Sequence, residues 1–434
     1  MVQLTPPERE LLEGSQGPGA AMAMRVVVAA ADALGAPRLI GVSSAHIDGC
    51  LYHGDGGVEF AEALYKGGAR VSVPTTLNVG ALDLLHPGRV RSDAHATDMA
   101  RRQMKAYVEM GADATFTCAP YQVGHEPGVG EQVAWGESNA IAFVNSVLGA
   151  RTERYGDFLD ACCAVTGRAP LYGLHLDENR RAQVVVDVTR VPQDLTRRDV
   201  FFPVLGTWLG REAGQAVVAI RGLSPTVTRD QLKALGAAAA STGAIALFHV
   251  VGVTPEAPTL SAALGLVGSD AGPPGWQTQP GAVFKDEITV DAAGLRSALD
   301  RLTTAHDADR VDAVAIGSPH SSLDELRELA RLLRGRRVQV PFYVCTARAT
   351  WAESEEDGTA AALRASGIDV VVDTCVVVAP VLPEAGGVLM TNSGKFAHYA
   401  PANTGYGVVY GSLEDCVATA VDGRLVRDEA MWRW

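Results

Sequence analysis

The chain alternates between short apolar runs and segments with helical periodicity. Near-continuous apolar runs, in contrast to alternating ones, are expected of strands covered on both faces, as in parallel sheets. Ten such runs end at a polar or Gly-rich turn: residues 38–44, 69–77, 114–118, 183–188, 215–220, 244–252, 312–317, 340–345, 369–375 and 387–394. The pattern therefore predicts an α/β protein with parallel or mixed sheets.

Two segments carry a clear helical pattern. Residues 135–151 place three aliphatic side chains on one stripe, and residues 322–335 form a second amphipathic stretch. Ser322 is a plausible N-cap of that second helix, because a hydroxyl there can accept from a free backbone N–H.

The length of 434 residues is too great for one ordinary hydrophobic core. Two segments rich in charged residues are candidate linkers between domains: residues 187–203, which also contain proline, and residues 291–310. We expect three α/β domains, at about 1–203, 204–300 and 301–434.

Charge and composition exclude several classes of protein. The net charge is −13, and no basic stripe interleaved with aromatic residues occurs, which argues against binding nucleic acid. No apolar run is long enough to span a membrane, and no N-terminal segment has the pattern of a signal peptide. We expect a cytoplasmic protein whose seven cysteines are reduced.

Polar side chains follow most of the predicted strands. In open α/β sheets, ligands bind outside the carboxyl ends of the strands. The residues found there include thiols, imidazoles, hydroxyls and one lysine: 43–46, 75–78, Cys118, 317–320, 345–346, 374–375 and 392–395. This repetition predicts a site at the carboxyl edge of the sheets.

Three cysteines each end a predicted strand: Cys118, Cys345 and Cys375. Three thiolates would hold a metal and leave a coordination position open for a substrate. The spacing lacks a CxxC motif, so both zinc and an iron–sulfur cluster stay open. The other four cysteines are interpreted as buried apolar residues: Cys50, Cys162, Cys163 and Cys416.

Further polar residues at these turns have two readings each. Lys395 follows a glycine turn and would either bind a substrate carboxylate or lie solvated on the surface. Glu137 and Ser138 begin a predicted helix, where a carboxylate suits the helix dipole and the helix end can also bind polar ligand groups. His46 and His320 at strand ends are either hydrogen-bonded structural residues or functional ones.

The longer motifs resemble one known family. The segments that carry the resemblance run in order along nearly the whole chain: 45–49, 73–78, 117–121, 136–152, 167–176, 248–260, 317–326, 373–375 and 392–399. With these blocks, among them "GESNAIAFVNSVLGART" and "NSGKFAHY", the chain resembles the aconitase X family.

The resemblance implies an aconitase-like fold of three α/β domains around a central iron site. The implied cofactor is an iron–sulfur cluster, [2Fe–2S] or [4Fe–4S], or a mononuclear iron. A smaller swivelling domain completes the site in this superfamily, either fused or as a separate small subunit. The chain has no such segment, so we expect it to be a large subunit whose partner supplies a catalytic serine.

The resemblance also implies a hydro-lyase that dehydrates a small 3-hydroxy acid. The leading expectation is conversion of cis-3-hydroxy-L-proline to Δ1-pyrroline-2-carboxylate. The alternatives are mevalonate 5-phosphate dehydration and a non-catalytic iron-binding subunit, the latter because Ser318 stands where some relatives carry cysteine. Asp48 disfavours the phosphorylated substrate, since it places an acid where the phosphate would lie.

Site residues follow from the same resemblance. Cys118 and Cys375 match metal ligands, with Cys345 or Ser318 as the third. The expected catalytic residues are His46, Glu137 and Lys395. Substrate contacts are expected from this set: Asp48, Gly49, Cys50, Leu51, Asn78, Ser138 and Lys395.

Overall fold

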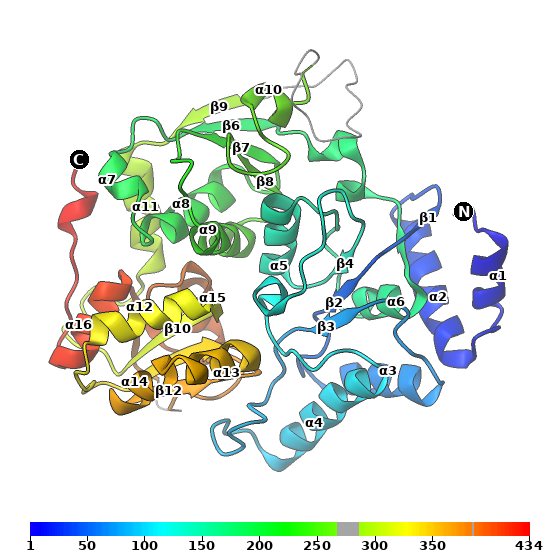
Figure 1. Cartoon of the computed structure of the whole chain (residues 1–434), viewed down its shortest axis with the longest axis horizontal. Coiled ribbons are helices and arrows are strands. Elements are labelled where there is room, and N and C mark those ends of the chain that lie inside the picture. The colour runs from blue at the N-terminus through cyan, green and yellow to red at the C-terminus, as the bar shows by residue number, and fades with distance from the viewer. Residues whose placement is uncertain (267–285, 384–385) are drawn as a thin grey trace.

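The computed structural model describes residues 1–266, 286–383 and 386–434 of the chain. Three parallel sheets, each covered by helices, follow one another along the sequence (Figure 1). The α/β fold with parallel sheets that the sequence predicts is therefore confirmed. No helix in the described part of the chain has the length and apolar character needed to cross a membrane.

The first sheet has the strand order β3–β2–β4. In its register, His46 of β2 lies beside Thr76 of β3 and Trp135 of β4. The strands are β2 (Ala45–Ile47), β3 (Thr75–Leu77) and β4 (Ala134–Trp135), and the small antiparallel pair beside them is β1 (Leu39–Gly41) and β5 (Arg168–Pro170). The helices are α1 (Pro6–Leu12), α2 (Pro18–Ala33), α3 (Asp55–Lys66), α4 (Ala94–Glu109), α5 (Ser138–Phe143) and α6 (Leu159–Thr166).

The second sheet has the order β8–β7–β6–β9. Its strands are β6 (Val184–Asp187), β7 (Val218–Arg221), β8 (Phe248–Val250) and β9 (Asp286–Thr289). The helices are α7 (Gln193–Thr196), α8 (Phe201–Glu212), α9 (Arg229–Thr242), α10 (Leu260–Ala263) and α11 (Ala292–Leu302). β6 lies on the N-terminal side of the expected boundary at 203, yet it pairs with β7 and β9.

The third sheet has the order β12–β11–β10–β13–β14, so the direction of winding reverses between β10 and β13. Such a reversal is where open α/β sheets bind ligands. The strands are β10 (Ala313–Ser321), β11 (Phe342–Thr346), β12 (Ile368–Val371), β13 (Val388–Thr391) and β14 (Gly407–Tyr410). The helices are α12 (Leu323–Leu333), α13 (Arg348–Glu356), α14 (Thr359–Ala365), α15 (Gly394–Thr404) and α16 (Leu413–Asp422).

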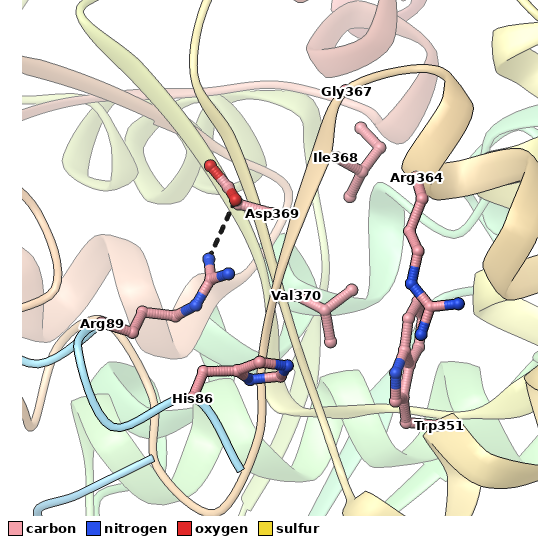
Figure 2. Close-up of a pocket in the computed structure, with 8 residues that line it drawn as sticks. All are labelled: His86, Arg89, Trp351, Arg364, Gly367, Ile368, Asp369 and Val370. Atoms are coloured by element: carbon pink, nitrogen blue, oxygen red, sulfur yellow. Dashed lines mark hydrogen bonds and ion pairs between the residues drawn. The ribbon is translucent and has the colours of Figure 1, made fainter.

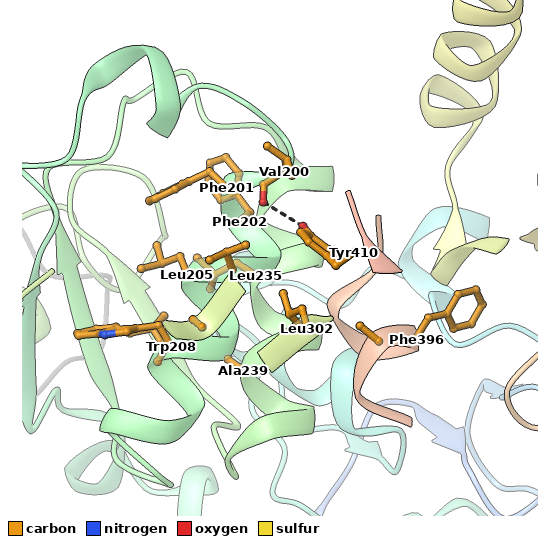
Figure 3. Packing of buried hydrophobic residues seen from close by; sticks show 14 of the residues in the cluster. Val200, Phe201, Phe202, Leu205, Trp208, Leu235, Ala239, Leu302, Phe396 and Tyr410 are labelled. Atoms are coloured by element: carbon orange, nitrogen blue, oxygen red, sulfur yellow. Dashed lines mark hydrogen bonds between the residues drawn. The ribbon is translucent and has the colours of Figure 1, made fainter. Parts of the chain in front are cut away.

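Helices α8 and α9 form an apolar layer between the second sheet and the third unit (Figure 1). They approach closely because a Cβ at Gly206 would lie 2.8 Å from Ala238 Cβ, a spacing that only glycine permits. Phe201, Leu205 and Leu235 fill this layer in one buried cluster (Figure 3). Tyr410 of β14 joins it and donates its hydroxyl to Val200 O at 3.0 Å. One continuous core therefore joins the second and third units.

Most predicted elements are present, with local differences. Helix α12 with Ser322 as its N-cap is confirmed, since the Ser322 side chain accepts from Glu325 N. The predicted strand at 114–118 is wrong: Phe116 has a φ of 40°, which interrupts an extended strand. The predicted helix 135–151 is shorter, because α5 ends at Phe143 and passes into a π-helical turn at Val144–Leu148.

Four short helical turns complete the described structure. They are Pro120–Val123, Gly173–His175, Asp177–Arg180 and Ala430–Trp432. The first of these turns follows Cys118 and directs the chain towards β4.

Candidate active site

An ion pair joins the carboxyl ends of strands in the first and third units. Glu137 is the N-cap of α5, where its side chain accepts from Asn139 N at 3.1 Å. Lys395 lies in the first turn of α15, after the reversal point of the third sheet. Its Nζ donates to Glu137 Oε1 at 2.7 Å and to Asn139 Oδ1 at 3.3 Å. The structure thus brings together two residues separated by 258 positions.

Asn78 links this ion pair to a second carboxyl group. Its Nδ2 donates to Glu137 Oε2 at 2.9 Å and also donates to Asp48 Oδ1. The Asn78 side chain is buried, and its Oδ1 has no hydrogen-bond partner among the described residues. An acceptor is therefore left over in the middle of the network.

The two carboxyl groups have opposite protonation preferences. Burial raises the pKa of Glu137, but the charge and hydrogen bond of Lys395 outweigh burial and lower that pKa to about 2. Burial, followed by the negative charges of Glu137, Asp157 and Asp160, raises the pKa of Asp48 well above its ordinary value. The pKa values of the two carboxyl groups are thus shifted in opposite directions.

Hydrogen bonds to buried groups stabilise the turn after β2. Asp160 Oδ2 accepts from Asp48 N at 2.6 Å, and Gly49 O accepts from Gln103 Nε2 at 2.7 Å. The Cys50 thiol donates to Asn78 O at 2.8 Å, so it fixes the turn against β3. Leu51 packs on the apolar core of the first unit. Ser138 Oγ, across the site, donates to Glu137 Oε1 at 3.1 Å.

Cys118 lies at the edge of this network. Its Sγ accepts from His320 N at 3.2 Å, and its carbonyl accepts from Asn139 Nδ2 at 2.6 Å. Burial raises the pKa of the thiol to about 12, and Lys395 opposes this rise. Segment 318–320 of β10 therefore lies directly against Cys118.

Cys375 and Cys345 are also buried near Cys118. Burial, followed by Cys375 and then, less strongly, Cys118, raises the pKa of Cys345. Ser318 lies two residues before His320, and its carbonyl accepts from Ser393 Oγ.

The chemistry of this donor set fits a thiolate-bound metal, because three thiols could supply three ligands, although Cys345 and Cys375 also pack in the apolar core that joins the second and third units. Within 1–266, 286–383 and 386–434, however, no three His, Cys, Asp or Glu side chains are already arranged to hold an ion. The fit therefore rests on the chemistry and burial of the donors.

His46 lies in β2, two residues before Asp48. Its Nδ1 is 2.9 Å from Thr76 Oγ1, and Glu137 acts on its pKa. His320 is buried between Thr117 Oγ1 at 3.0 Å and Thr374 O at 3.1 Å. Both rings are therefore ordered by hydrogen bonds at strand ends.

Sequence reasoning missed two residues of the network, Asn139 and Asp160. Asn139 is next to the predicted Glu137–Ser138 pair, and it joins the Lys395 amine to the backbone of Cys118. Asp160 lies in a helix whose pattern gives no functional signal, and only the tertiary structure places it under Asp48. The neighbourhood of Glu137 could have indicated the first of these.

A separate pocket of about 340 Å³ lies beside β12 (Figure 2). Arg89 and Asp369 line it and form an ion pair at 3.0 Å, and His86 and Trp351 line it as well. None of the network residues lines this pocket. It is therefore distinct from the candidate site.

Three α/β units with parallel sheets, in which the first and third units meet at an ion pair beside buried thiols, are the arrangement expected of an aconitase-like enzyme. Family models agree: the chain matches the aconitase X first domain over residues 1–178, the second domain over 182–272 and the third domain over 311–422. The chain belongs to the aconitase X family.

Named relatives are dehydratases. A cis-3-hydroxy-L-proline dehydratase of Pseudomonas aeruginosa is 42% identical over 423 residues, which cover 96% of this chain and 70% of that protein. A phosphomevalonate dehydratase large subunit of Methanothermobacter thermautotrophicus is 39% identical, covering 94% of this chain and 96% of that protein. The chain is thus a hydro-lyase of this family.

A solved structure agrees with the fold. The crystal structure of Thermococcus kodakaraensis aconitase X in its holo-form superposes with a TM-score of 0.83 at 33% identity. The match covers 96% of this chain and 100% of that one. The aconitase-like fold expected from the sequence is confirmed.

Proposed function

We propose that this chain dehydrates cis-3-hydroxy-L-proline to Δ1-pyrroline-2-carboxylate. Two cis-3-hydroxy-L-proline dehydratases, at 42% and 40% identity, support the substrate. The observation that carries the proposal is the Lys395–Glu137–Asn78–Asp48 network, which offers a cation to a carboxylate and acceptors to an amine. A zwitterionic amino acid needs both.

Lys395 binds the substrate carboxylate in this proposal, exchanging part of its bond with Glu137 for the new anion. Asp48 and the unpartnered Oδ1 of Asn78 accept from the ring ammonium. An arriving cation favours the ionised form of Asp48, since opposite charge lowers a carboxyl pKa. Gly49, Cys50, Leu51 and Ser138 shape the walls: the first three on the turn after β2, the last at the start of α5.

Dehydration requires loss of the α-proton and of the β-hydroxyl group. His46 and Glu137 are the groups proposed to assist proton transfer. Both lie at the carboxyl edge of the first sheet, and a positioned base of this kind contributes about 10²–10⁴-fold in rate. The partner's serine is a further candidate base.

The proposed cofactor contains iron, and its form is [2Fe–2S], [4Fe–4S] or mononuclear. Cys118 and Cys375 would hold it, with Cys345 or Ser318 as the third ligand. A bound iron with an open position would polarise the hydroxyl and carboxylate oxygens of the substrate and make hydroxide a better leaving group. The contact of Cys118 Sγ with His320 N, at the carboxyl end of β10, supports a ligand position between the first and third units.

Metal analysis tests the ligand assignment. Cys118→Ser is expected to lower the iron content of the anaerobically purified chain by more than half, while Cys162→Ala, in α6, leaves it unchanged. Cys118→Ser with full iron would contradict the assignment. Parallel Cys345→Ser and Ser318→Ala variants decide between the two candidates for the third ligand.

The proposed assembly includes a separate small swivelling-domain subunit. The phosphomevalonate dehydratase relatives are named large subunits, and this chain spans 96% of one of them. We also propose that the protein acts in the cytoplasm, where its seven free cysteines stay reduced. We further propose three domains near 1–203, 204–300 and 301–434, with the pairing of β6 favouring an earlier first boundary.

Mevalonate 5-phosphate is the second candidate substrate, because five named relatives are phosphomevalonate dehydratase large subunits. A turnover panel separates the two, using the iron-loaded chain with and without the small subunit. We expect turnover of cis-3-hydroxy-L-proline and not of mevalonate 5-phosphate. Asp48→Asn should raise KM for hydroxyproline, since it removes the carboxylate that faces the amine. Turnover of the phosphate alone would overturn the proposal, and iron without any turnover would favour a non-catalytic iron-binding subunit.

A further inference from the structure

The backbone has an unusual conformation just before two of the candidate metal ligands. Among the described residues, four that are not glycine have a positive φ, and two of these are Phe116, with a φ of 40°, and Asp373, with a φ of 62°. Phe116 lies two residues before Cys118, and Asp373 lies two residues before Cys375. A positive φ is uncommon for a residue with a side chain and is strained for one as bulky as phenylalanine, so surrounding contacts must stabilise it.

One arginine contacts both of these residues. Arg348 is the first residue of α13 and lies three positions after Cys345 of β11. Its Nε donates to Asp373 Oδ1 at 2.7 Å, and its Nη2 donates to Asp373 Oδ2. Its Cζ also lies over the Phe116 ring, 5.3 Å from the ring centroid. Arg348 therefore binds one residue through a two-bonded carboxylate pair and the other through a cation–π contact.

The first unit contacts Asp373 from another direction. Gly80 N donates to Asp373 O at 2.8 Å, and Leu84 N donates to Asp373 Oδ2 at 3.3 Å. The Asp373 side chain is buried, so these bonds are shielded from water. The turn that leads to Cys375 is therefore bonded both to the first unit and to Arg348.

Phe116 lies between Arg348 and the first sheet. Its ring belongs to the buried apolar core of the first unit. Directly after it, Thr117 N donates to Leu77 O at 3.0 Å, which ties the backbone to β3. Because Phe116 belongs to the first unit and Asp373 to the third, a single guanidinium sets the separation between their two turns.

We propose that Arg348 is a positioning residue of the proposed iron site: it holds the turns before Cys118 and Cys375 at the separation that lets both thiolates reach one ion. This rests on the ligand assignment in the proposed function. A lysine at this position would keep a charge opposite Asp373, but a compact ammonium cannot make two parallel bonds to a carboxylate and also cover a ring. The role therefore requires the shape of the guanidinium as well as its charge.

Titration of the iron-free chain with Co²⁺ tests this role without turnover, since thiolate ligation of Co²⁺ gives a visible charge-transfer band. Arg348→Met and Arg348→Lys should each weaken Co²⁺ binding by at least about tenfold, as expected for loss of a group that orients metal ligands. Arg89→Met is the matched control, because Arg89 also pairs with an aspartate of the third unit, Asp369 at 3.0 Å, but in the separate pocket beside β12 (Figure 2). This control should leave the affinity unchanged. Binding by Arg348→Met as tight as that of wild type would overturn the proposal.

Urea unfolding of the same iron-free variants separates positioning from a purely structural role. Arg348→Met leaves the buried Asp373 carboxylate without its cation and should lower the unfolding midpoint. Arg348→Lys supplies a charge for that carboxylate, so its midpoint should lie closer to that of wild type, although its Co²⁺ affinity is as low as that of Arg348→Met. If the Co²⁺ affinities of the two variants instead follow their midpoints, Arg348 acts only through stability and the proposal is overturned.

Hydrogen exchange of the iron-free chain tests the link between the two turns. Arg348→Met should speed exchange in residues 371–376 and also in residues 114–118, whereas Arg89→Met should leave residues 114–118 unchanged. Faster exchange in residues 371–376 alone would overturn the proposal. Unchanged Co²⁺ binding by Cys118→Ser would refute the ligand assignment, and this proposal with it, whereas unchanged binding by Arg348→Met alone leaves the proposed function standing.

Discussion

The ion pair between Lys395 and Glu137 offers a quantitative test of the site. The exposed fractions of the two side chains are 13% and 9%, so solvent screens the pair only weakly. At 2.7 Å and an effective dielectric constant of about 20, their attraction is about 6 kcal/mol before desolvation. Removing one partner of such a pair typically costs about 3–5 kcal/mol, because the other charge is left buried alone.

Lys395→Met should therefore lower the free energy of unfolding by about 3 kcal/mol, since Glu137 loses the cation with which it forms an ion pair. Glu137→Gln should cost about 2 kcal/mol, because Lys395 keeps its bond to Asn139 Oδ1 and the new amide still offers an acceptor. The double variant buries no unpaired charge, and we expect it to cost about 2 kcal/mol as well. The coupling energy would then be about 3 kcal/mol, within the range for residues in contact.

Urea unfolding at pH 7 and 0.15 M salt measures these differences as shifts in midpoint at constant m-value. All three variants should lack turnover, because both residues belong to the proposed site. The double variant should be more stable than Lys395→Met and equally inactive. The ion pair also makes the free energy of unfolding depend on pH. Lys395 lowers the pKa of Glu137 from 4.5 to about 2, so the stabilisation by the ion pair is complete above pH 4.5 and is lost as the pH falls towards 2. If the two single costs simply add in the double variant, the residues are not a coupled buried pair and the reasoning is refuted.

Three further predictions concern the site floor, acid stability and a buried cation. Gly136→Ala should reduce turnover at least tenfold, because its Cβ would overlap the Asp160 carboxylate, whereas Gly56→Ala has open space and should not; activity assays on both decide this. Burial lowers the pKa of His175 to about 3, so the folded protein loses stability as pH falls below about 6.5, and His175→Gln should reduce by about one the protons taken up on acid unfolding. Arg180 forms a buried ion pair with Glu256 at 2.9 Å, and the Glu256 side chain is 3% exposed. Arg180→Met should therefore lower the free energy of unfolding by at least about 3 kcal/mol, because it leaves this carboxylate unpaired; a melting temperature equal to that of wild type would contradict this.

The strand ends could be predicted from the sequence because apolar runs and glycine turns are local signals. Lys395 follows such a turn, and the structure places it at the reversal of the third sheet, where ligands are expected. The prediction of a strand at 114–118 was wrong because Phe116 has a positive φ, which nothing in the local sequence indicates. The ends of a strand can therefore be predicted where glycine or polar turn residues follow it. They cannot be predicted where the backbone conformation has no such signal in the local sequence.

Contacts between strands could not be read in the same way. Thr76 and His46 are 30 residues apart, and only the register of the first sheet makes their side chains neighbours. Asp160 lies 112 residues from Asp48, in a helix with no functional pattern. Register and helix docking depend on the whole core, so the polar partners of a predicted site residue stay unknown until the fold is known.

The position of Lys395 connects the two halves of the proposed chemistry. Its amine pairs with Glu137, and its charge also opposes the rise that burial causes in the pKa of Cys118. A substrate carboxylate that draws Lys395 from Glu137 would therefore change the field at the thiol as well as at the carboxylate. Asn139 strengthens this connection, since its Oδ1 accepts from Lys395 while its Nδ2 donates to Cys118 O. Because Lys395 belongs to the third unit and Cys118, Asn139 and Glu137 to the first, the proposed site is assembled only when these two units are docked. The ion pair joins the two units, and in the proposed function its lysine would also bind the substrate.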